Sequence, residues 1–320
     1  MPVAQLLRDE APELATTRFA GKVSRATRTS ARILRRVPPG TLLVFVAWVS
    51  ATHAEAVNVV AAENVYGDIA SQVGDGHVTV TSILTNPNQD PHEFEASAAT
   101  ARAIADGRVV IVNGANYDPW AMKLLAASRS SSREVIDVAR LMHKKPGDNP
   151  HLWYDPGAVS ALAEALAVQL TRIDRENRDD YARGLAAFEA AMRPLRERIA
   201  AMRKRHAGAA VTATEPVFQY MAEALGLTMR NGRFQLAVMN GAEPSAAAIA
   251  AFERDLRARA VKVLLYNSQT SQALAERMRS IAEEAGVPVV AVTETAPPGM
   301  SYQAWMLAQL EALDRALASP

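Results

Sequence analysis

The sequence predicts an α/β protein with two lobes, each with a largely parallel sheet flanked by helices, joined by one long connecting helix. Three observations support this prediction. Short β-branched runs alternate with helical stretches in the first half of the chain, the alternation returns in the second half, and the stretch between the halves has no strand pattern. Such alternation is typical of β-α-β units with parallel strands.

Residues 55–178 are expected to form the N-terminal lobe. In chain order, the pattern predicts a strand, a helix, a strand, a helix and a strand at Val57–Ala61, Glu63–Val73, Val78–Ile83, Ala98–Ala105 and Val109–Val112. Glycine and asparagine, which favour turns, bound the last of these strands at Gly107 and Asn113-Gly114.

The stretch from Gly157 to His206 is predicted to be helical. Its apolar residues recur at helical spacing, with a polar break at residues 174–177. We therefore expect two helices, of which the second, residues 179–206, links the lobes, and Pro194 is a candidate site for a kink in it. One continuous doubly wound sheet is the alternative arrangement.

Residues 207–320 are expected to form the C-terminal lobe. Strands are predicted at Ala209–Ala213, Val261–Leu265 and Val289–Val292, and helices at Val217–Leu225, Ser245–Arg259, Ser271–Ala285 and Tyr302–Leu317. Pro288 stands just before the last strand, where a missing N–H is tolerated.

The first 54 residues have the order of an export signal. Eight Lys and Arg against three Asp and Glu are followed by an apolar run from Leu42 to Val49 and then by Ala51-Thr52-His53-Ala54, an A-x-A-like cleavage site. The run is about half of the ~20 apolar residues that a membrane-spanning helix needs. We therefore predict a signal peptide with a long basic region over residues 1–54, rather than a membrane anchor.

Composition excludes several kinds of site. The 320 residues include no cysteine, so no disulfide, thiolate metal ligand, cysteine nucleophile or lipid-modified cysteine is expected. Lys and Arg (35) nearly balance Asp and Glu (34), which argues against a nucleic-acid partner. Without residues 1–54 the counts are 27 and 31, so the exported part is mildly acidic.

Two histidines, His92 and His151, lie in proline-fixed loops. Pro91 and Pro150 directly precede them, and a preceding proline restricts the direction of the imidazole. Loops at the carboxyl ends of parallel strands are where α/β folds bind ligands. These two histidines are candidate metal ligands, with ordinary loop histidines as the alternative. Three others stand in polar surroundings and are expected to be surface residues: His77, His143 and His206.

The two proline-histidine loops, the segment Gly114–Trp120 and the long central helix together resemble the zinc- and manganese-binding solute-binding proteins of bacterial ABC importers. The resemblance covers about residues 56–318, and its most specific piece is Asn149-Pro150-His151-x-Trp153-x-Asp155-Pro156. It implies two α/β lobes that bind one divalent metal ion in the cleft between them, with two ligands from each lobe.

Residue by residue, the resemblance makes His92 and His151 the ligands of the N-terminal lobe. In the C-terminal lobe it points to Glu215, where zinc-type members usually have histidine and manganese-type members have glutamate. It also points to Glu294, where the family normally has aspartate. The implied cargo is one divalent transition metal ion, Mn²⁺ or Zn²⁺. The nearby candidates for hydrogen bonds to the imidazoles are Asp90, Glu93 and Asp155.

The implied function is a periplasmic binding protein that captures the ion and delivers it to an ABC-type permease, without catalysing a reaction. Because cysteine is absent, the protein is expected to be free in the periplasm, not lipidated and without a stable membrane anchor. It is also expected to be a monomer. The alternative is a secreted metal-dependent hydrolase, although the chain lacks H-E-x-x-H and G-x-S-x-G motifs. A surface adhesin with the same fold is a third possibility.

Overall fold

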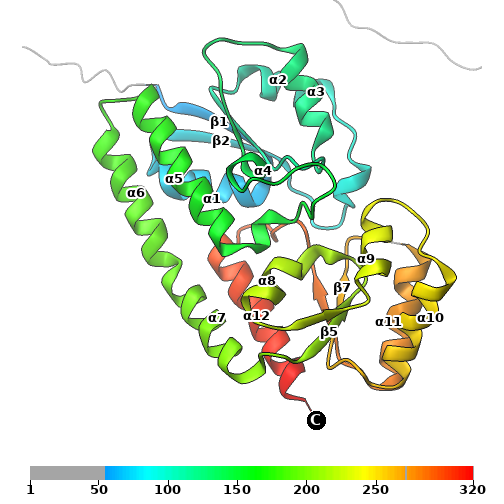
Figure 1. Ribbon diagram of the computed structural model, residues 1–320. Coiled ribbons are helices and arrows are strands. Elements are labelled where there is room, and N and C mark those ends of the chain that lie inside the picture. Colours follow the sequence, from blue (N-terminus) through cyan, green and yellow to red (C-terminus); the bar gives the residue numbers. More distant parts are fainter. Residues whose placement is uncertain (1–54, 271, 320) are drawn as a thin grey trace, which may run out of the picture. The chain divides into compact units, whose positions relative to one another are not determined.

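The computed structural model describes residues 55–270 and 272–319, and they contain two four-stranded sheets whose strands are all parallel (Figure 1). The two predicted lobes are therefore confirmed, and the alternative of one continuous sheet is wrong. The predicted signal peptide, residues 1–54, lies outside the described residues.

The sheet of the N-terminal lobe has the strand order β2-β1-β3-β4. The strands are β1 (Val57–Glu63), β2 (Val78–Leu84), β3 (Val109–Val112) and β4 (Glu134–Asp137). The central strands β1 and β3 are almost entirely buried, which explains why they stand out as apolar runs in the sequence. The helices are α1 (Asn64–Gly74), α2 (Ala98–Asp106), α3 (Pro119–Ala127) and α4 (Val138–Leu141), with 3₁₀ turns η1 (Pro91–Glu93) and η2 (Leu152–Tyr154).

The sheet of the C-terminal lobe has the order β6-β5-β7-β8. The strands are β5 (Ala210–Ala213), β6 (Thr228–Arg230), β7 (Leu264–Asn267) and β8 (Val289–Val292). The helices are η3 (Pro216–Phe218), α8 (Gln219–Ala224), α9 (Gly232–Met239), α10 (Ala246–Arg257), α11 (Ala273–Ala285) and α12 (Tyr302–Ala318). The strand predicted at Val261–Leu265 begins three residues later, because the ladders to β5 and β8 start at Leu264.

Three helices fill the predicted helical stretch: α5 (Pro156–Ile173), α6 (Arg178–Ala191) and α7 (Arg193–His206). Helices α6 and α7 follow one another from the N-terminal to the C-terminal sheet, and the break between them falls at Met192, two residues before Pro194 (Figure 1). The predicted kink is confirmed, since proline cannot supply the N–H that a continuous helix needs.

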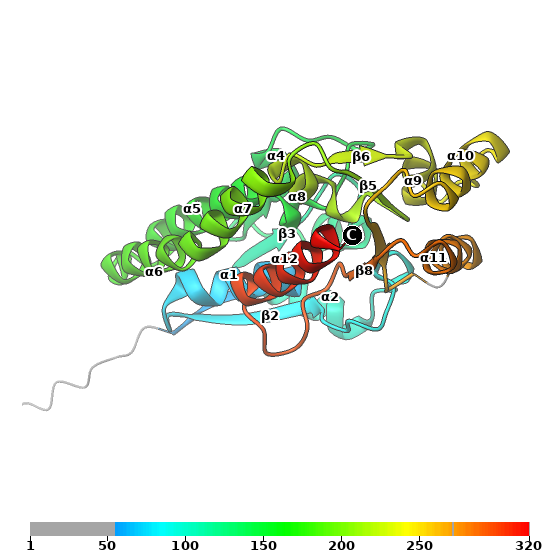
Figure 2. The same ribbon diagram turned by 90° about the horizontal axis from the view of Figure 1, so that it is seen from below.

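Helix α6 lies very close to α1. A Cβ atom added at Gly184 would stand 2.3 Å from the carbonyl oxygen of Val73, so only glycine fits at this crossing. His77, expected to be a surface residue, is half-buried, and its Nε2 lies 2.7 Å from Asp180 of α6. His206 is also paired, 2.7 Å from Asp314 of α12, which packs along α7 (Figure 2). The surface prediction is therefore wrong for both, and His143 alone is exposed as expected.

One hydrophobic core extends through both lobes. Tyr154 of the N-terminal lobe has its ring centroid 4.9 Å from that of Phe218 and 5.7 Å from that of Trp305. All three side chains are at most 2% exposed. The lobes are therefore packed together as well as linked by helices. In the described part of the chain, no helix has both the length and the hydrophobicity needed to cross a membrane.

Candidate metal centre

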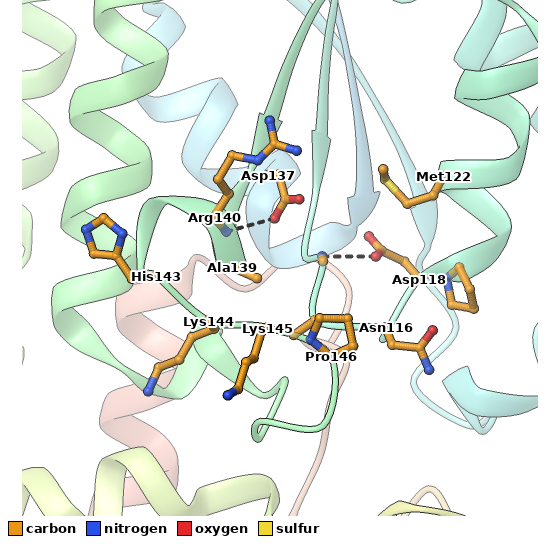
Figure 3. A pocket seen from close by; sticks show the side chains of 13 residues that line it. Asn116, Asp118, Met122, Asp137, Ala139, Arg140, His143, Lys144, Lys145 and Pro146 are labelled. Atoms are coloured by element: carbon orange, nitrogen blue, oxygen red, sulfur yellow. Dashed lines mark hydrogen bonds between the residues drawn. The ribbon is translucent and has the colours of Figure 1, made fainter.

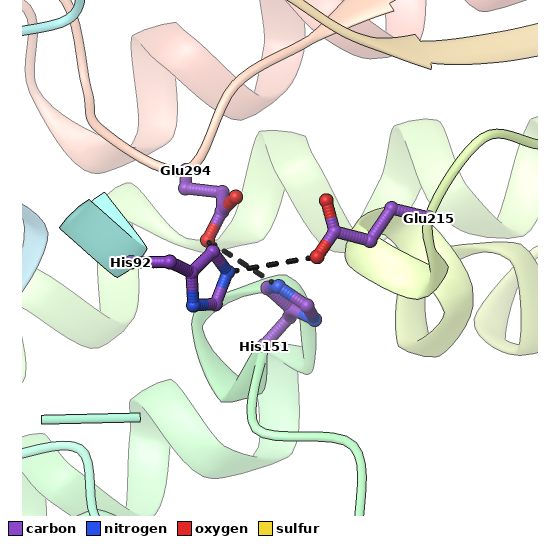
Figure 4. A group of neighbouring side chains, drawn as sticks. All are labelled: His92, His151, Glu215 and Glu294. Atoms are coloured by element: carbon purple, nitrogen blue, oxygen red, sulfur yellow. Dashed lines mark ion pairs between the residues drawn. The ribbon is translucent and has the colours of Figure 1, made fainter. Parts of the chain in front are cut away.

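All four predicted ligands follow the carboxyl ends of parallel strands. His92 lies in η1 after β2, and His151 directly precedes η2 after β4 and α4. Glu215 and Glu294 lie two residues beyond the ends of β5 and β8. The structure brings the four side chains together, with one nitrogen or oxygen atom from each within 4.8 Å of the others (Figure 4).

Local backbone constraints hold the ligand loops. The carboxylate of Asp90 accepts a hydrogen bond from the backbone N–H of His92 at 2.9 Å and so caps η1. The side chain of Asn149 accepts from the backbone N–H of His151 at 3.1 Å. Glu215 precedes Pro216, whose fixed φ starts η3. The prolines and the side-chain caps explain why these residues, although in loops, have defined directions.

The distances among the four side chains fit a small divalent cation. The Nε2 atom of His92 lies 3.5 Å from Oε1 of Glu215 and 3.6 Å from Oε2 of Glu294, and Nε2 of His151 lies 3.3 Å from the same oxygen of Glu294. A tetrahedral ion with bonds of about 2.0–2.1 Å has ligand-to-ligand distances of about 3.3–3.4 Å. The cluster is therefore close to the size that such an ion requires.

The cluster is buried, except on one side. The side chains of His151 and Glu294 are 0% exposed and that of Glu215 is 4% exposed, whereas His92 is 36% exposed. The buried Nε2 atom of His151 has no hydrogen-bond partner. Buried polar atoms are almost always satisfied, so an imidazole nitrogen without a hydrogen-bond partner that faces the carboxylate of Glu294 is the arrangement expected of a metal ligand.

Asn149 orients the imidazole of His151. Its Oδ1 atom lies 2.6 Å from Nδ1 of His151, while its amide group donates to the carbonyl of Pro216 at 2.7 Å. Because Oδ1 can only accept, Nδ1 carries the proton and Nε2 is directed at the carboxylates. The prediction that Asp90, Glu93 or Asp155 would hold an imidazole is wrong for His151. Asp155 instead caps α5 by accepting from Gly157.

Three further side chains hold the two glutamates: Tyr117, from the segment Gly114–Trp120, and Asn267 and Gln269, which the sequence did not single out. The amide nitrogen of Asn267 donates to Oε2 of Glu215 at 2.9 Å and to Oε1 of Glu294 at 2.7 Å, and the hydroxyl of Tyr117 donates to Oε2 of Glu294 at 2.8 Å. Gln269 accepts from the backbone N–H of Glu294 and donates to the carbonyl of Gln89, in the loop that carries His92. Asn267 and Gln269 could have been identified by their position at the end of β7, on the same sheet edge as the two glutamates.

The charges within the cluster shift several pKa values. Burial lowers the pKa of His92, but Glu215, Glu294 and Asp90 outweigh burial and raise it from 6.5 to about 9. Burial raises the pKa of Glu294, yet the two imidazoles and the Tyr117 hydroxyl lower it overall. Burial, followed by the charge of Glu294, raises the pKa of Tyr117, which therefore remains a hydrogen-bond donor. A proton on the imidazoles and a divalent cation compete for the same place.

A separate cavity of about 610 Å³ opens at the carboxyl ends of β3 and β4 (Figure 3). None of the four clustered residues lines it. Arg140, Lys144 and Lys145 line it. The carboxylate of Asp137, which also lines it, accepts a hydrogen bond from the backbone N–H of Arg140 at 3.0 Å. With this excess of positive charge the cavity does not suit a metal cation.

Comparison with known proteins finds a matching family. The model of the family described as zinc-uptake complex component A, periplasmic (ZnuA), matches residues 59–316. The chain is 24% identical to the manganese-binding lipoprotein MntA of Halalkalibacterium halodurans over 148 residues, 45% of this chain and 48% of MntA. It thus spans about half the length of that relative.

Two other proteins match over most of the chain. The manganese ABC transporter substrate-binding lipoprotein PsaA of Streptococcus pneumoniae is 21% identical over 293 residues, 83% of this chain and 91% of PsaA. The solved structure of the periplasmic zinc-binding protein TroA of Treponema pallidum has a TM-score of 0.69 at 17% identity and covers 82% of this chain and 100% of TroA. The structural likeness confirms the two-lobed fold.

Proposed function

The chain belongs to the zinc-uptake complex component A family of periplasmic proteins, and from this premise we propose that it captures a divalent transition metal ion for uptake. The ion, Mn²⁺ or Zn²⁺, is bound by His92, His151, Glu215 and Glu294 and is delivered to an ABC-type permease. The observation that carries the proposal is the cluster itself, in which an unpartnered His151 nitrogen faces a buried carboxylate between the lobes.

The ligand set suits a transported ion. Two neutral imidazoles and two carboxylates balance the charge of a divalent cation, so the buried site needs no other counter-ion. No thiolate is present to hold the ion irreversibly. Imidazole and carboxylate ligands accept both zinc and manganese, and geometry then decides between them.

A binding role is favoured over catalysis. A catalytic metal site keeps an open position for water or substrate, whereas here four side chains each offer a ligand atom, all within 4.8 Å of one another. MntA and PsaA are named for manganese binding and transport, and the hydrolase alternative gains no support from them. We therefore propose that the protein catalyses no reaction.

The cellular setting follows from the family, whose description is periplasmic. We propose that the mature protein is a monomer, free of the membrane, with the permease and the metal ion as partners and no nucleic-acid partner. MntA and PsaA are lipoproteins, but this chain has no cysteine to carry a lipid, which supports a protein that is not lipidated.

The site assignment is tested by calorimetric titration of the exported chain with Mn²⁺ and Zn²⁺. His92→Ala and Glu215→Ala should each lower the affinity at least about tenfold, since even partners of metal ligands contribute that much. His143→Ala, at an exposed histidine outside the cluster, is the matched control and should bind like the parent. Unchanged affinity in both cluster variants would refute the assignment, and metal-dependent esterase or peptidase turnover would favour the hydrolase.

A further inference from the structure

Asn267, the last residue of β7, lies behind both carboxylates of the cluster and is 2% exposed. Its single amide nitrogen donates one hydrogen bond to Glu215 and one to Glu294. We propose that Asn267 sets the coordination number of the site, and through it the preference for zinc over manganese. This inference rests on the proposed function, because it concerns the same metal-binding residues.

Hydrogen bonds of both the side chain and the backbone of Asn267 fix the direction of its amide. Its Oδ1 atom accepts from the backbone N–H of Gln269 at 3.1 Å, and its own backbone N–H donates to Thr214 at 3.2 Å. Turning the amide over would point Oδ1 at two carboxylates and lose all three side-chain hydrogen bonds. The NH₂ group is therefore held toward the glutamates.

Each carboxylate divides its two oxygens between the amide and the imidazoles. Oε2 of Glu215 and Oε1 of Glu294 accept from Asn267, whereas Oε1 of Glu215 and Oε2 of Glu294 lie 3.3–3.6 Å from the imidazole nitrogens. In Figure 4 one oxygen of Glu215 points at the imidazoles and its other oxygen points away. Asn267 thus holds the outer oxygen of each glutamate, Oε2 of Glu215 and Oε1 of Glu294, and leaves the inner oxygen directed at the imidazoles.

Two imidazole nitrogens and two single carboxylate oxygens give a coordination number of four. Zinc is satisfied by four ligands in a tetrahedron, whereas manganese prefers more oxygen ligands. A glutamate that bound through both oxygens would have to turn its outer oxygen from Asn267 toward the ion, which would weaken the hydrogen bond of a buried N–H. Asn267 thus disfavours the larger coordination shell.

The test compares Asn267→Ala with the parent in competition titrations for both ions. The ratio of the manganese Kd to the zinc Kd should fall at least about tenfold in the variant, because the outer oxygens become available. Asn240→Ala is the matched control, because it makes the same substitution at an exposed asparagine outside the cluster. Its ratio should stay within about threefold of the parent.

Cobalt spectroscopy reports the coordination number directly. Co²⁺ bound to the parent should show the intense visible bands of a four-coordinate ion, and these should weaken in Asn267→Ala. Weak bands in the parent, or an unchanged ratio and spectrum in the folded variant, would overturn the inference and leave the proposed function intact. If the parent binds neither zinc nor manganese, the proposed function itself fails.

Discussion

Replacing Asn149 by alanine removes the acceptor that holds Nδ1–H of His151. The hydrogen bond is 2.6 Å long, and the imidazole it orients is completely buried. Without the acceptor the proton can move to Nε2, the atom directed at Glu294, and a protonated Nε2 cannot bind a metal. We therefore expect weaker binding of zinc and of manganese alike.

The expected loss is tenfold to a hundredfold in affinity, the range found for hydrogen-bond partners of metal-bound histidines. At about 1.4 kcal/mol for each factor of ten, the loss corresponds to about 1.4–2.7 kcal/mol. That energy agrees with the roughly 1.5–3 kcal/mol of one hydrogen bond to a charged group. The same range applies here because a metal ion on Nε2 draws electrons from the imidazole and makes Nδ1–H a stronger donor.

The assay is competition against a chromophoric chelator at constant pH, with circular dichroism to verify folding. Asn149→Asp is the informative companion, because it keeps the acceptor for His151 but loses the donor to Pro216. Recovery of affinity in Asn149→Asp would assign the effect to the imidazole rather than to the contact between the lobes. An alanine variant that folds and binds both ions within about threefold of the parent would refute the reasoning.

Two other predictions concern stability. Gly184→Ala should lower the free energy of unfolding by about 1–3 kcal/mol, because its Cβ would overlap the carbonyl of Val73, whereas Gly232→Ala, with no atom within 4 Å of the added Cβ, should cost nothing. Equal urea midpoints for the two variants would contradict the tight crossing. Burial raises the pKa of Asp314, but its hydrogen bond with His206 and its arginine partners lower it overall. Asp314→Asn should therefore cost about 1 kcal/mol at pH 7, and the difference from the parent should vanish as the pH falls below 3.8 through the lowered pKa. A pH-independent difference in thermal unfolding would argue against the ion pairs.

The sequence predicts six of the eight strands and misses two, β4 and β6. Val109–Val112 is β3 at the predicted bounds, because a strand buried on both faces must be apolar throughout. Strands β4 and β6 stand at sheet edges and are only partly buried, so they include polar residues and form no long apolar run. The predicted bounds of β7 begin too early because Val261 and Val263 are buried apolar residues, although they precede Leu264, the first residue paired with β8.

The candidate ligands were predictable, whereas Asn267, which holds both carboxylates, was not. His92 and His151 stand out because each directly follows a proline in a loop. The resemblance to a known family adds Glu215 and Glu294 to the candidate ligands. Asn267 lies 52 residues from Glu215 and 27 from Glu294 along the chain, so its two hydrogen bonds exist only after the strands are assembled. No local pattern distinguishes an asparagine that orients carboxylates from one that ends a strand.

The aromatic packing between the lobes has an energetic consequence for how the ion exchanges. Wide separation of the lobes would expose Tyr154, Phe218 and Trp305, at roughly 1.5–3 kcal/mol for each side chain. The total of roughly 5–9 kcal/mol is comparable with the entire stability of an ordinary domain. Parting the lobes is therefore costly, and the less costly route for the ion passes His92, the one partly exposed member of the cluster.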